Sequence, residues 1–357
     1  MAIKAHNAGS LSFTEIVAEW GGSTPHGLDE YHSGESLVYA GATGAPGGTT
    51  TTIPSSGTIS FSNFYGSEAF VNSPGNVVTI TTPGTTTATV PAGANTLYII
   101  RAVGAGGEGL NGLGYDRAGS ESSGPGGGAG AHIKSHFFAV SAGETITFTV
   151  GAGGSGIASN SSYSSDRGYG NPRFSTGFGI LWGDSSDADD GEATTISASS
   201  TGDLVTVNGG QGATNDGQGQ VQGPLRGQGV GVGGTVGTVA TPRSSGSYVV
   251  SGSTIDITGI TDFNTSAAGG DGTGGNATNN QPGNHFGGDN SNGAGGSGGD
   301  SIANSGGAGD TSGSTAGGSD GAFGSGGGGG AALGSQAHSL GGEGGDGMIE
   351  YWFLQVN

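Results

Sequence analysis

Apolar and polar positions near the N-terminus follow the spacing of a short amphipathic helix. Ser12 and Glu15 form a capping box, and Leu11 and Ile16 flank it as a hydrophobic staple. This pattern predicts a helix that begins after Ser12, runs to about Trp20 and stops at the glycines that follow. The first part of the chain is therefore expected to be helical.

A related motif returns further along. Residues 9–13 and 57–61 share the pattern Gly-Ser/Thr-Leu/Ile-Ser-Phe, so we expect a second capped turn at 59–64, with a third at 28–31 between them. Together they predict a small N-terminal module of short capped helices over residues 1–68. Because a module of this size buries little apolar surface, we expect it to pack on a partner. The aromatic residues expected in this anchoring module are Phe13, Trp20, Phe61, Phe64 and Tyr65.

From residue 76 onward, Thr and Val are concentrated in short runs, which is typical of β-strands. Residues 77–90 predict a hairpin, with Pro83 and Gly84 at its centre. The last strand, 348–356, is expected to share a sheet with the first strands of this second domain, residues 76–357. Further strands are expected at 96–103, 132–140, 145–150, 204–207 and 254–260.

Two of these strands end in the same five residues. Both 103–107 and 150–154 are Val-Gly-Ala-Gly-Gly, and the strand at 204–207 runs into Asn-Gly-Gly as a degenerate third case. Strands that continue into projecting glycine-rich loops are therefore predicted to be one repeated construction.

Glycine sets the pattern of the last quarter, residues 269–347. Gly318, Gly321, Gly324, Gly327 and Gly330 are each three positions apart. Period three is the repeat of the polyproline II helix, which leaves every backbone N–H and C=O group free, and glycine lets such helices approach closely enough to bond to each other. The predicted fold class is thus mainly β with packed glycine-rich polyproline/polyglycine II helices.

Composition supports this interpretation. Of the 357 residues, 85 are glycine and only 31% are hydrophobic, so an ordinary apolar core cannot extend through the whole chain. Buried backbone groups must then find partners in each other. The alternative is a flexible Gly/Ser-rich linker, which has the same composition.

The balance of acidic and basic residues limits the kinds of partner that the chain can bind. With 8 Lys and Arg against 28 Asp and Glu, the formal net charge is −20, which argues against nucleic acid and anionic membrane surfaces as partners. No cysteine is present, so disulfides and zinc-cysteine sites are excluded. The N-terminus lacks the apolar region of a signal peptide, so synthesis in the cytoplasm is expected.

The sequence contains only weak matches to nucleotide-binding, catalytic and metal-binding motifs. Two Gly-x-Gly-x-x-Gly matches at 104–109 and 151–156 open no helix that could bind a pyrophosphate, and no catalytic constellation is found, so an enzyme is not expected. Residues 295–302 and 341–348 each fit the nonapeptide calcium repeat, but that fold needs tandem copies and these stand apart. Chance is the favoured explanation of the two matches, so no cofactor is expected. Ca²⁺ is the one cofactor that this pattern would allow. The histidines show no metal-ligand spacing.

Aromatic residues gather in one segment outside the expected strands. Large rigid side chains on loops above a scaffold are typical of recognition surfaces. A small satellite core under a long loop would use the same residues, and both interpretations stay open. The residues predicted to bind a receptor are Tyr163, Tyr169, Phe174, Phe178 and Trp182, together with His285, Phe286 and Phe323 at other expected loop tips.

With these residues named, the chain resembles bacteriophage tail proteins. Ser-Leu-Ser-Phe at 10–13 and Ile-Pro-Ser-Ser-Gly-Thr-Ile-Ser-Phe-Ser-Asn-Phe-Tyr-Gly at 53–66 resemble a module at the start of phage tail and fibre proteins. The remainder, with Val-Gly-Ala-Gly-Gly twice and a final Gly-Gly-Asp-Gly before a strand, resembles the glycine-rich domain of tail-fibre tips. It is also similar to the receptor-recognising adhesin of T-even-like phages, whose polyglycine II helices carry variable loops. This chain differs because strands feed its glycine segments repeatedly.

The resemblance implies a virion protein without enzymatic activity, located in the tail and made in the host cytoplasm. Its N-terminal module would attach to other tail or fibre proteins, and its glycine-rich domain would contact a protein or glycan receptor on the host surface. A purely structural tail or capsid decoration protein is the alternative, and an ice-binding protein is a third, which would need a flat, regular face of small residues. Homo-oligomer formation remains open.

Overall fold

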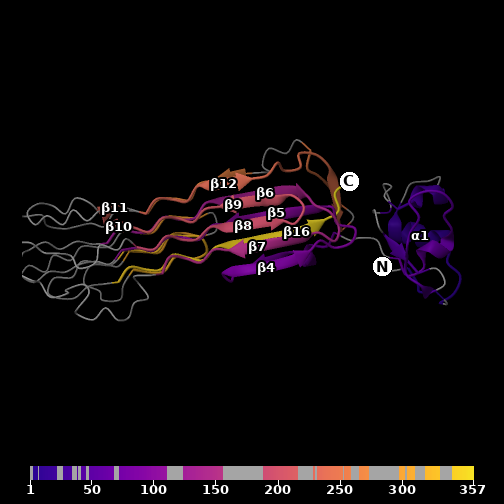
Figure 1. Cartoon of the computed structure of the whole chain (residues 1–357), viewed down its shortest axis with the longest axis horizontal. Helices are drawn as coiled ribbons and strands as arrows, with labels where there is room; N and C mark the ends of the chain where they lie inside the picture. Colours follow the sequence, from indigo (N-terminus) through magenta and orange to yellow (C-terminus); the bar gives the residue numbers. More distant parts are fainter. Residues whose placement is uncertain are drawn as a thin grey trace, which may run out of the picture.

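The computed structural model forms three parts in a row along one long axis: the N-terminal module, a β-sandwich and a glycine-rich bundle (Figure 1). The structure describes residues 3–6, 8–21, 27–33, 38, 42–45, 48–67, 72–110, 124–155, 188–215, 228–229, 231–251, 253–258, 265–272, 297–301, 304–309, 318–329 and 340–357.

The N-terminal module contains the predicted helical turns. Helix α1 (Phe13–Trp20) starts at the Ser12 capping box and ends at Gly21, as the sequence predicts. The turns η1 (Leu28–Tyr31) and η3 (Phe61–Phe64) are short 3₁₀-helices at the expected positions. Strands β1 (Thr43–Gly44) and β2 (Thr51–Thr52) pair antiparallel beside them.

The sandwich consists of two antiparallel five-stranded sheets. The order of one is β12-β9-β8-β7-β4, and the order of the other is β15-β6-β5-β16-β3. The bounds are β3 Val78–Ile80, β4 Gly84–Thr89, β5 Thr96–Val103, β6 His132–Ala139, β7 Thr145–Val150, β8 Thr194–Ala198, β9 Gly202–Val207, β12 Val236–Val239, β15 Thr265–Ala267 and β16 Met348–Leu354. The prediction that the last strand shares a sheet with the first strands is confirmed, because β16 pairs with both β3 and β5.

The apolar core lies between the two sheets. Phe148 of β7 stacks on Tyr351 of β16 with ring centroids 4.2 Å apart. Ile99, Ile133 and Ile196 are fully buried in the same cluster. Alternating side chains of each strand thus form the sandwich core, as expected for paired antiparallel sheets.

The predicted hairpin at 77–90 is wrong. Strands β3 and β4 flank Pro83 as expected, but β3 pairs with β16 and β4 pairs with β7 in the other sheet. The chain crosses from sheet to sheet at this turn because each strand completes the edge of a different layer. Strands β8, β12 and β15 are further elements that the sequence analysis did not predict.

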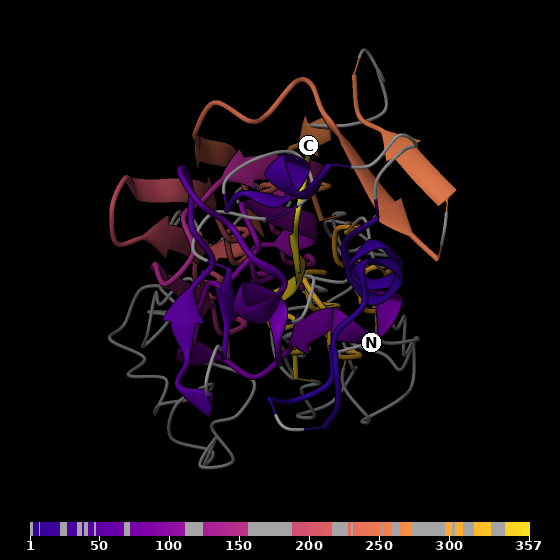
Figure 2. The same ribbon diagram turned by 90° about the vertical axis from the view of Figure 1, so that its right-hand side faces the viewer.

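The second face of the β15-to-β3 sheet carries a smaller cluster. A hairpin of β13 (Ser247–Val250) and β14 (Ser253–Asp256) contributes Tyr248, which packs with Phe137 and Trp352 of the sheet. In the end view the orange hairpin stands to one side of the molecule (Figure 2). The turn η4 (Pro74–Asn76) precedes β3, and the two-residue strands β10 (Thr214–Asn215) and β11 (Gln228–Gly229) pair at the far end of the bundle.

Twelve segments outside any helix or sheet, most of them rich in glycine, make up the bundle. Most continue directly from a sandwich strand or lead directly into one, so the chain runs out from the sandwich and back again (Figure 1). We number them I (104–110), II (124–131), III (151–155), IV (188–193), V (208–213), VI (231–235), VII (268–272), VIII (297–301), IX (304–309), X (318–322), XI (324–329) and XII (340–347).

Candidate functional site

Backbone hydrogen bonds in the bundle join one segment to another with a period of three residues. Successive N–H groups of segment I donate to three neighbours in turn, and the order then repeats. The donors are Gly104, Gly107 and Leu110 toward segment II, Ala105 and Glu108 toward segment IV, and Gly106 and Gly109 toward segment XII. Segment II follows the same rule toward segments XI, V and VII.

Three segments form the interior of the bundle. Segment I bonds to segments II, III, IV, V, XI and XII, when bonds given and bonds accepted are taken together. Segments II and XI each bond to six segments in the same way, and the three interior segments bond to one another. Six neighbours around each member is the arrangement of a hexagonal packing of parallel rods.

The other nine segments form a closed ring around these three. Each ring member bonds to the next by at least one backbone hydrogen bond. The order around the ring is IV, V, VI, VII, VIII, IX, X, XII, III and back to IV. Backbone bonding therefore holds the bundle together in every direction across its section, where an ordinary domain would rely on apolar side chains.

Glycine is required at many of the positions where two segments touch. A methyl group on Gly107 would overlap the carbonyl oxygen of Gln211, and one on Gly127 would overlap the carbonyl oxygen of Gly107. On Gly326, a methyl group would overlap the carbonyl oxygen of Gly127. These glycines of the three interior segments thus admit no side chain without moving a neighbouring backbone.

Carboxylates complete the hydrogen bonding of the ring. A ring segment has fewer neighbours than an interior one, so some of its N–H groups face no backbone carbonyl. An Asp or Glu of the adjacent ring segment accepts these bonds, at distances of 2.7 to 3.2 Å. The acceptors are Asp190 for Gly212, Glu192 for Ala152, Asp271 for Gly233, Asp300 for Gly306, Asp320 for Glu343 and Asp346 for Gly153.

This structural use of acidic residues was not foreseen from the sequence. The signal was present, because Gly-Gly-x-Gly-Gly-Asp occurs at 295–300 and again at 341–346, where it was compared with calcium repeats. In the structure Asp300 and Asp346 each accept a backbone N–H. Within the described ranges, no group of three or more His, Cys, Asp or Glu side chains could hold a metal ion.

Two glutamates of the bundle lie in unusual surroundings. Glu108 of segment I is fully buried, and its carboxylate accepts the N–H of Asp189 at 3.2 Å. Burial raises the pKa of Glu343, and the nearby carboxylates of Asp320 and Asp346 raise it further. Three carboxyl groups thus lie close to one another where segments X and XII meet.

The far end of the bundle carries a small apolar cluster of Leu110, Ala188 and Ala213. These residues stand at the outer ends of segments I, IV and V. The chain ranges that join the outward and returning segments start and finish at this end, as follows from the pairing of neighbours and from Figure 1. These ranges are 111–123, 156–187, 216–227, 273–296, 310–317 and 330–339, and all lie outside the described residues.

Most residues predicted to bind a receptor fall in these joining ranges. Tyr163, Tyr169, Phe174, Phe178 and Trp182 lie between segments III and IV, and His285 and Phe286 lie between VII and VIII, so all seven are outside the described residues.

Phe323 is described, and it stands in an exposed turn rather than in one of the joining ranges. Its carbonyl oxygen accepts the hydroxyl of Ser301, and a methyl group on Gly324 would overlap Val103 at the end of β5. The turn that carries Phe323 therefore lies at the base of the bundle, beside the sandwich. Here the chain arrives along segment X and leaves along segment XI in the opposite direction. The glycines spaced three residues apart continue through this turn, so their pattern gave no sign of it.

The N-terminal module divides the five predicted anchoring residues into two groups. Trp20 and Phe64 are buried in the module's own core, while Phe13 and Tyr65 are half-buried. Phe61 is 43% exposed and meets Phe13 edge-to-face at 5.8 Å. Of the five, Phe61 is the one whose ring is open to a partner.

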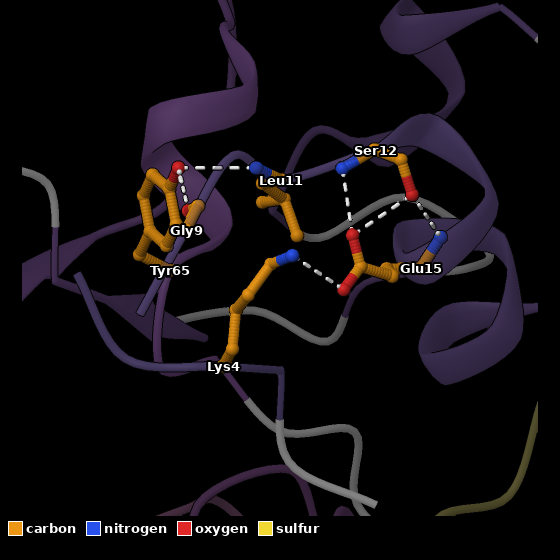
Figure 3. A network of polar contacts seen from close by, with 6 residues as sticks. All are labelled: Lys4, Gly9, Leu11, Ser12, Glu15 and Tyr65. Atoms are coloured by element: carbon orange, nitrogen blue, oxygen red, sulfur yellow. Dashed lines mark hydrogen bonds and ion pairs between the residues drawn. The ribbon is translucent and has the colours of Figure 1, made fainter. Parts of the chain in front are cut away.

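Polar contacts tie the two capped turns of the module together (Figure 3). The Tyr65 hydroxyl donates to the carbonyl oxygen of Gly9 and accepts the N–H of Leu11. Glu15 accepts the N–H of Ser12 and pairs with Lys4 at 2.8 Å. The bonds to Lys4 and Ser12 lower the pKa of Glu15 to about 2.

Within the described part of the chain, no helix is long and apolar enough to cross a membrane. Comparison of the chain with protein-family models and with curated proteins gives no match.

Proposed function

We propose that the twelve glycine-rich segments are polyglycine II helices. A helix with three residues per turn points its N–H groups in three directions in succession, so consecutive residues bond to different neighbours. The donor order along segments I and II has this period. The overlap that a methyl group would cause on Gly107 and Gly127 fits the close approach of such helices.

We further propose that the protein is a bacteriophage tail-fibre or tail-tip protein that recognises the host surface. The observation that carries this proposal is the common direction of the bundle, in which paired segments run out from the sandwich and are joined at the same far end. Ranges of 8 to 32 residues join the pairs there. Loops presented together on a rigid scaffold are a common design for recognition, because their sequences can change without refolding the scaffold.

The N-terminal module serves as the attachment site in this proposal. It lies at the opposite end of the molecule from β10 and β11, which mark the far end of the bundle (Figure 1). Its sequence resemblance to the start of phage tail and fibre proteins supports attachment to another tail or fibre protein. The exposed ring of Phe61 gives that contact an apolar centre, because aromatic residues commonly anchor protein interfaces.

The test is adsorption of the full-length protein to bacterial cells of the phage's host strain. We expect saturable binding by the labelled protein, and loss of binding for Tyr169→Ala, Phe178→Ala or Trp182→Ala with an unchanged melting temperature. Phe323→Ala is a matched aromatic control at the base of the bundle and should bind as the parent does. Full adsorption by the three loop variants would refute the assignment of the site.

A structural tail or capsid decoration protein is the alternative. It predicts no saturable binding of the full chain to host cells, together with normal incorporation into particles. Cell binding and particle incorporation, measured on the same preparation, therefore separate the two functions.

A further inference from the structure

One edge of the sandwich is open to a further strand. The four edge strands of the two sheets are β3, β4, β12 and β15. Strands β3 and β15 have three residues each, and β12 has four and shifts register against β9. Strand β4 has six residues in regular register with β7. Short or irregular edges discourage unwanted pairing, so β4 is the edge that lacks this protection.

The alternation of the antiparallel ladder shows which groups β4 offers. Just beyond the strand, the N–H of Val90 donates to the backbone carbonyl oxygen of Glu144, which continues the β4–β7 register. Since the bonding side alternates along an antiparallel strand, Ala88, Thr86 and Gly84 bond toward β7 as Val90 does. The N–H and C=O groups of Thr85, Thr87 and Thr89 then point away from β7. No described strand pairs with β4 on that side, and Figure 1 shows it at the border of the sandwich.

The absence of charge at this edge indicates which partner fits. The chain carries a formal net charge of −20, so most surfaces of two copies repel each other. Residues 69–100, which contain both β3 and β4, include no Asp, Glu, Lys, Arg or His. A second copy can thus approach this edge without placing like charges in contact.

We propose that β4 pairs antiparallel with β4 of a second copy of this chain, about a two-fold axis at Thr87. In this register Thr87 faces Thr87, and Thr85 faces Thr89, so each hydrogen-bonded pair consists of two threonines. Threonine pairs across strands stabilise sheets, and Thr85 already contacts Thr149 of β7 in this way, with hydroxyl oxygens 3.1 Å apart.

The apolar side of the strand agrees with this pairing. Ala88 of β4 and Ile80 of β3 are only partly covered where they meet the sandwich core. On that side the two-fold register places Ala88 opposite Thr86, so the second sheet continues the first without a bulky clash. Because the two chains run in opposite directions, each bundle lies at the same end of the dimer as the N-terminal module of the other copy. The proposal does not rest on the proposed function.

The test is the mass of the full-length protein by sedimentation velocity over a range of concentrations. We expect the parent chain to form a dimer and Thr87→Lys to raise its dissociation constant about 100-fold or more, because like charges then face each other at the axis. Thr147→Lys adds the same charge to the same face one strand further in, and should leave the dimer intact. An equimolar mixture of Thr87→Lys and Thr87→Glu should restore it.

A parent chain that stays monomeric at all concentrations would overturn the proposal. So would a Thr87→Lys variant that remains as dimeric as the parent, or a mixture of the two charged variants that fails to associate.

Discussion

The N–H of Gly107 donates to the carbonyl oxygen of Gly128 at 2.8 Å, which joins two of the three interior segments of the bundle. Neither glycine has room for a side chain. A methyl group on Gly128 would overlap the carbonyl oxygen of Val232, and one on Gly107 would overlap that of Gln211. The bond between these two glycines thus depends on the absence of side chains toward two further segments.

Substitution of an interior glycine is expected to destabilise the whole bundle. Gly128→Ala forces segment VI away from segment II and should lower the free energy of unfolding by about 3 kcal/mol or more. Ser319→Ala, on an exposed position of ring segment X, is the control and should change stability little. Calorimetric unfolding of both variants measures the difference, and equal melting temperatures would contradict the account of close packing.

Removal of a ring carboxylate is expected to leave a backbone N–H without its acceptor. Asp346→Ala removes the partner of the Gly153 N–H, 3.0 Å away and partly buried, which should cost about 1 kcal/mol. Asp346→Asn keeps a side-chain oxygen and should recover most of that loss. Denaturant unfolding of the two variants provides the comparison. If both lose equal stability, the negative charge rather than the hydrogen bond is what matters.

Glu343 is expected to favour stability at low pH. Its pKa is raised by burial and by Asp320 and Asp346, so the folded state binds this proton more tightly than the unfolded chain does. The contribution of the group to stability therefore rises as pH falls through its folded pKa, and is lost above it.

Glu343→Gln removes the charge, so the variant should melt above the parent at pH 7, and the difference should shrink toward pH 4. Asp203→Asn, an equal charge change at the exposed start of strand β9, serves as the control. A pH-independent difference would show that the effect does not come from titration.

Phe61 and Phe64 are expected to separate attachment from folding. Phe64 is fully buried, so Phe64→Ala should lower the stability of the module by about 3–5 kcal/mol. Phe61 is exposed, so Phe61→Ser should leave the module folded while reducing incorporation into particles. Limited proteolysis of the full chain reports folding, and immunoblots of purified particles report incorporation. Normal incorporation of Phe61→Ser would exclude Phe61 from the contact.

Local signals in the sequence were enough to predict much of the architecture. The Ser12 capping box gave the position of α1, and the bounds of β5 and β7 agree with their predicted ranges residue for residue. These features depend on residues next to one another in the chain. The pairing of β3 and β4 was missed because the turn at Pro83 is local, whereas the choice of sheet depends on β16 and β7, which lie far along the chain.

The order of the bundle could not be predicted for a related reason. Many of its contact positions are glycines, which carry no side chain that could distinguish one neighbour from another. The cues that do differ are carboxylates such as Asp271 and Asp300, and their hydrogen bonds become evident only when the segments stand side by side. The reversal at Phe323 was missed because the three-residue glycine spacing continues through the turn.

Segment XI and strand β16 belong to the last part of the chain, yet both lie between earlier pieces: segment XI is interior to the bundle, and β16 lies between β5 and β3. During translation, the earlier segments and strands therefore emerge from the ribosome before the pieces that fill the middle. A polypeptide terminated before residue 324 would lack an interior segment of the bundle and an inner strand of the sheet. We therefore expect such truncated products not to reach the native fold, because the pieces made first would be left without the partners that lie between them.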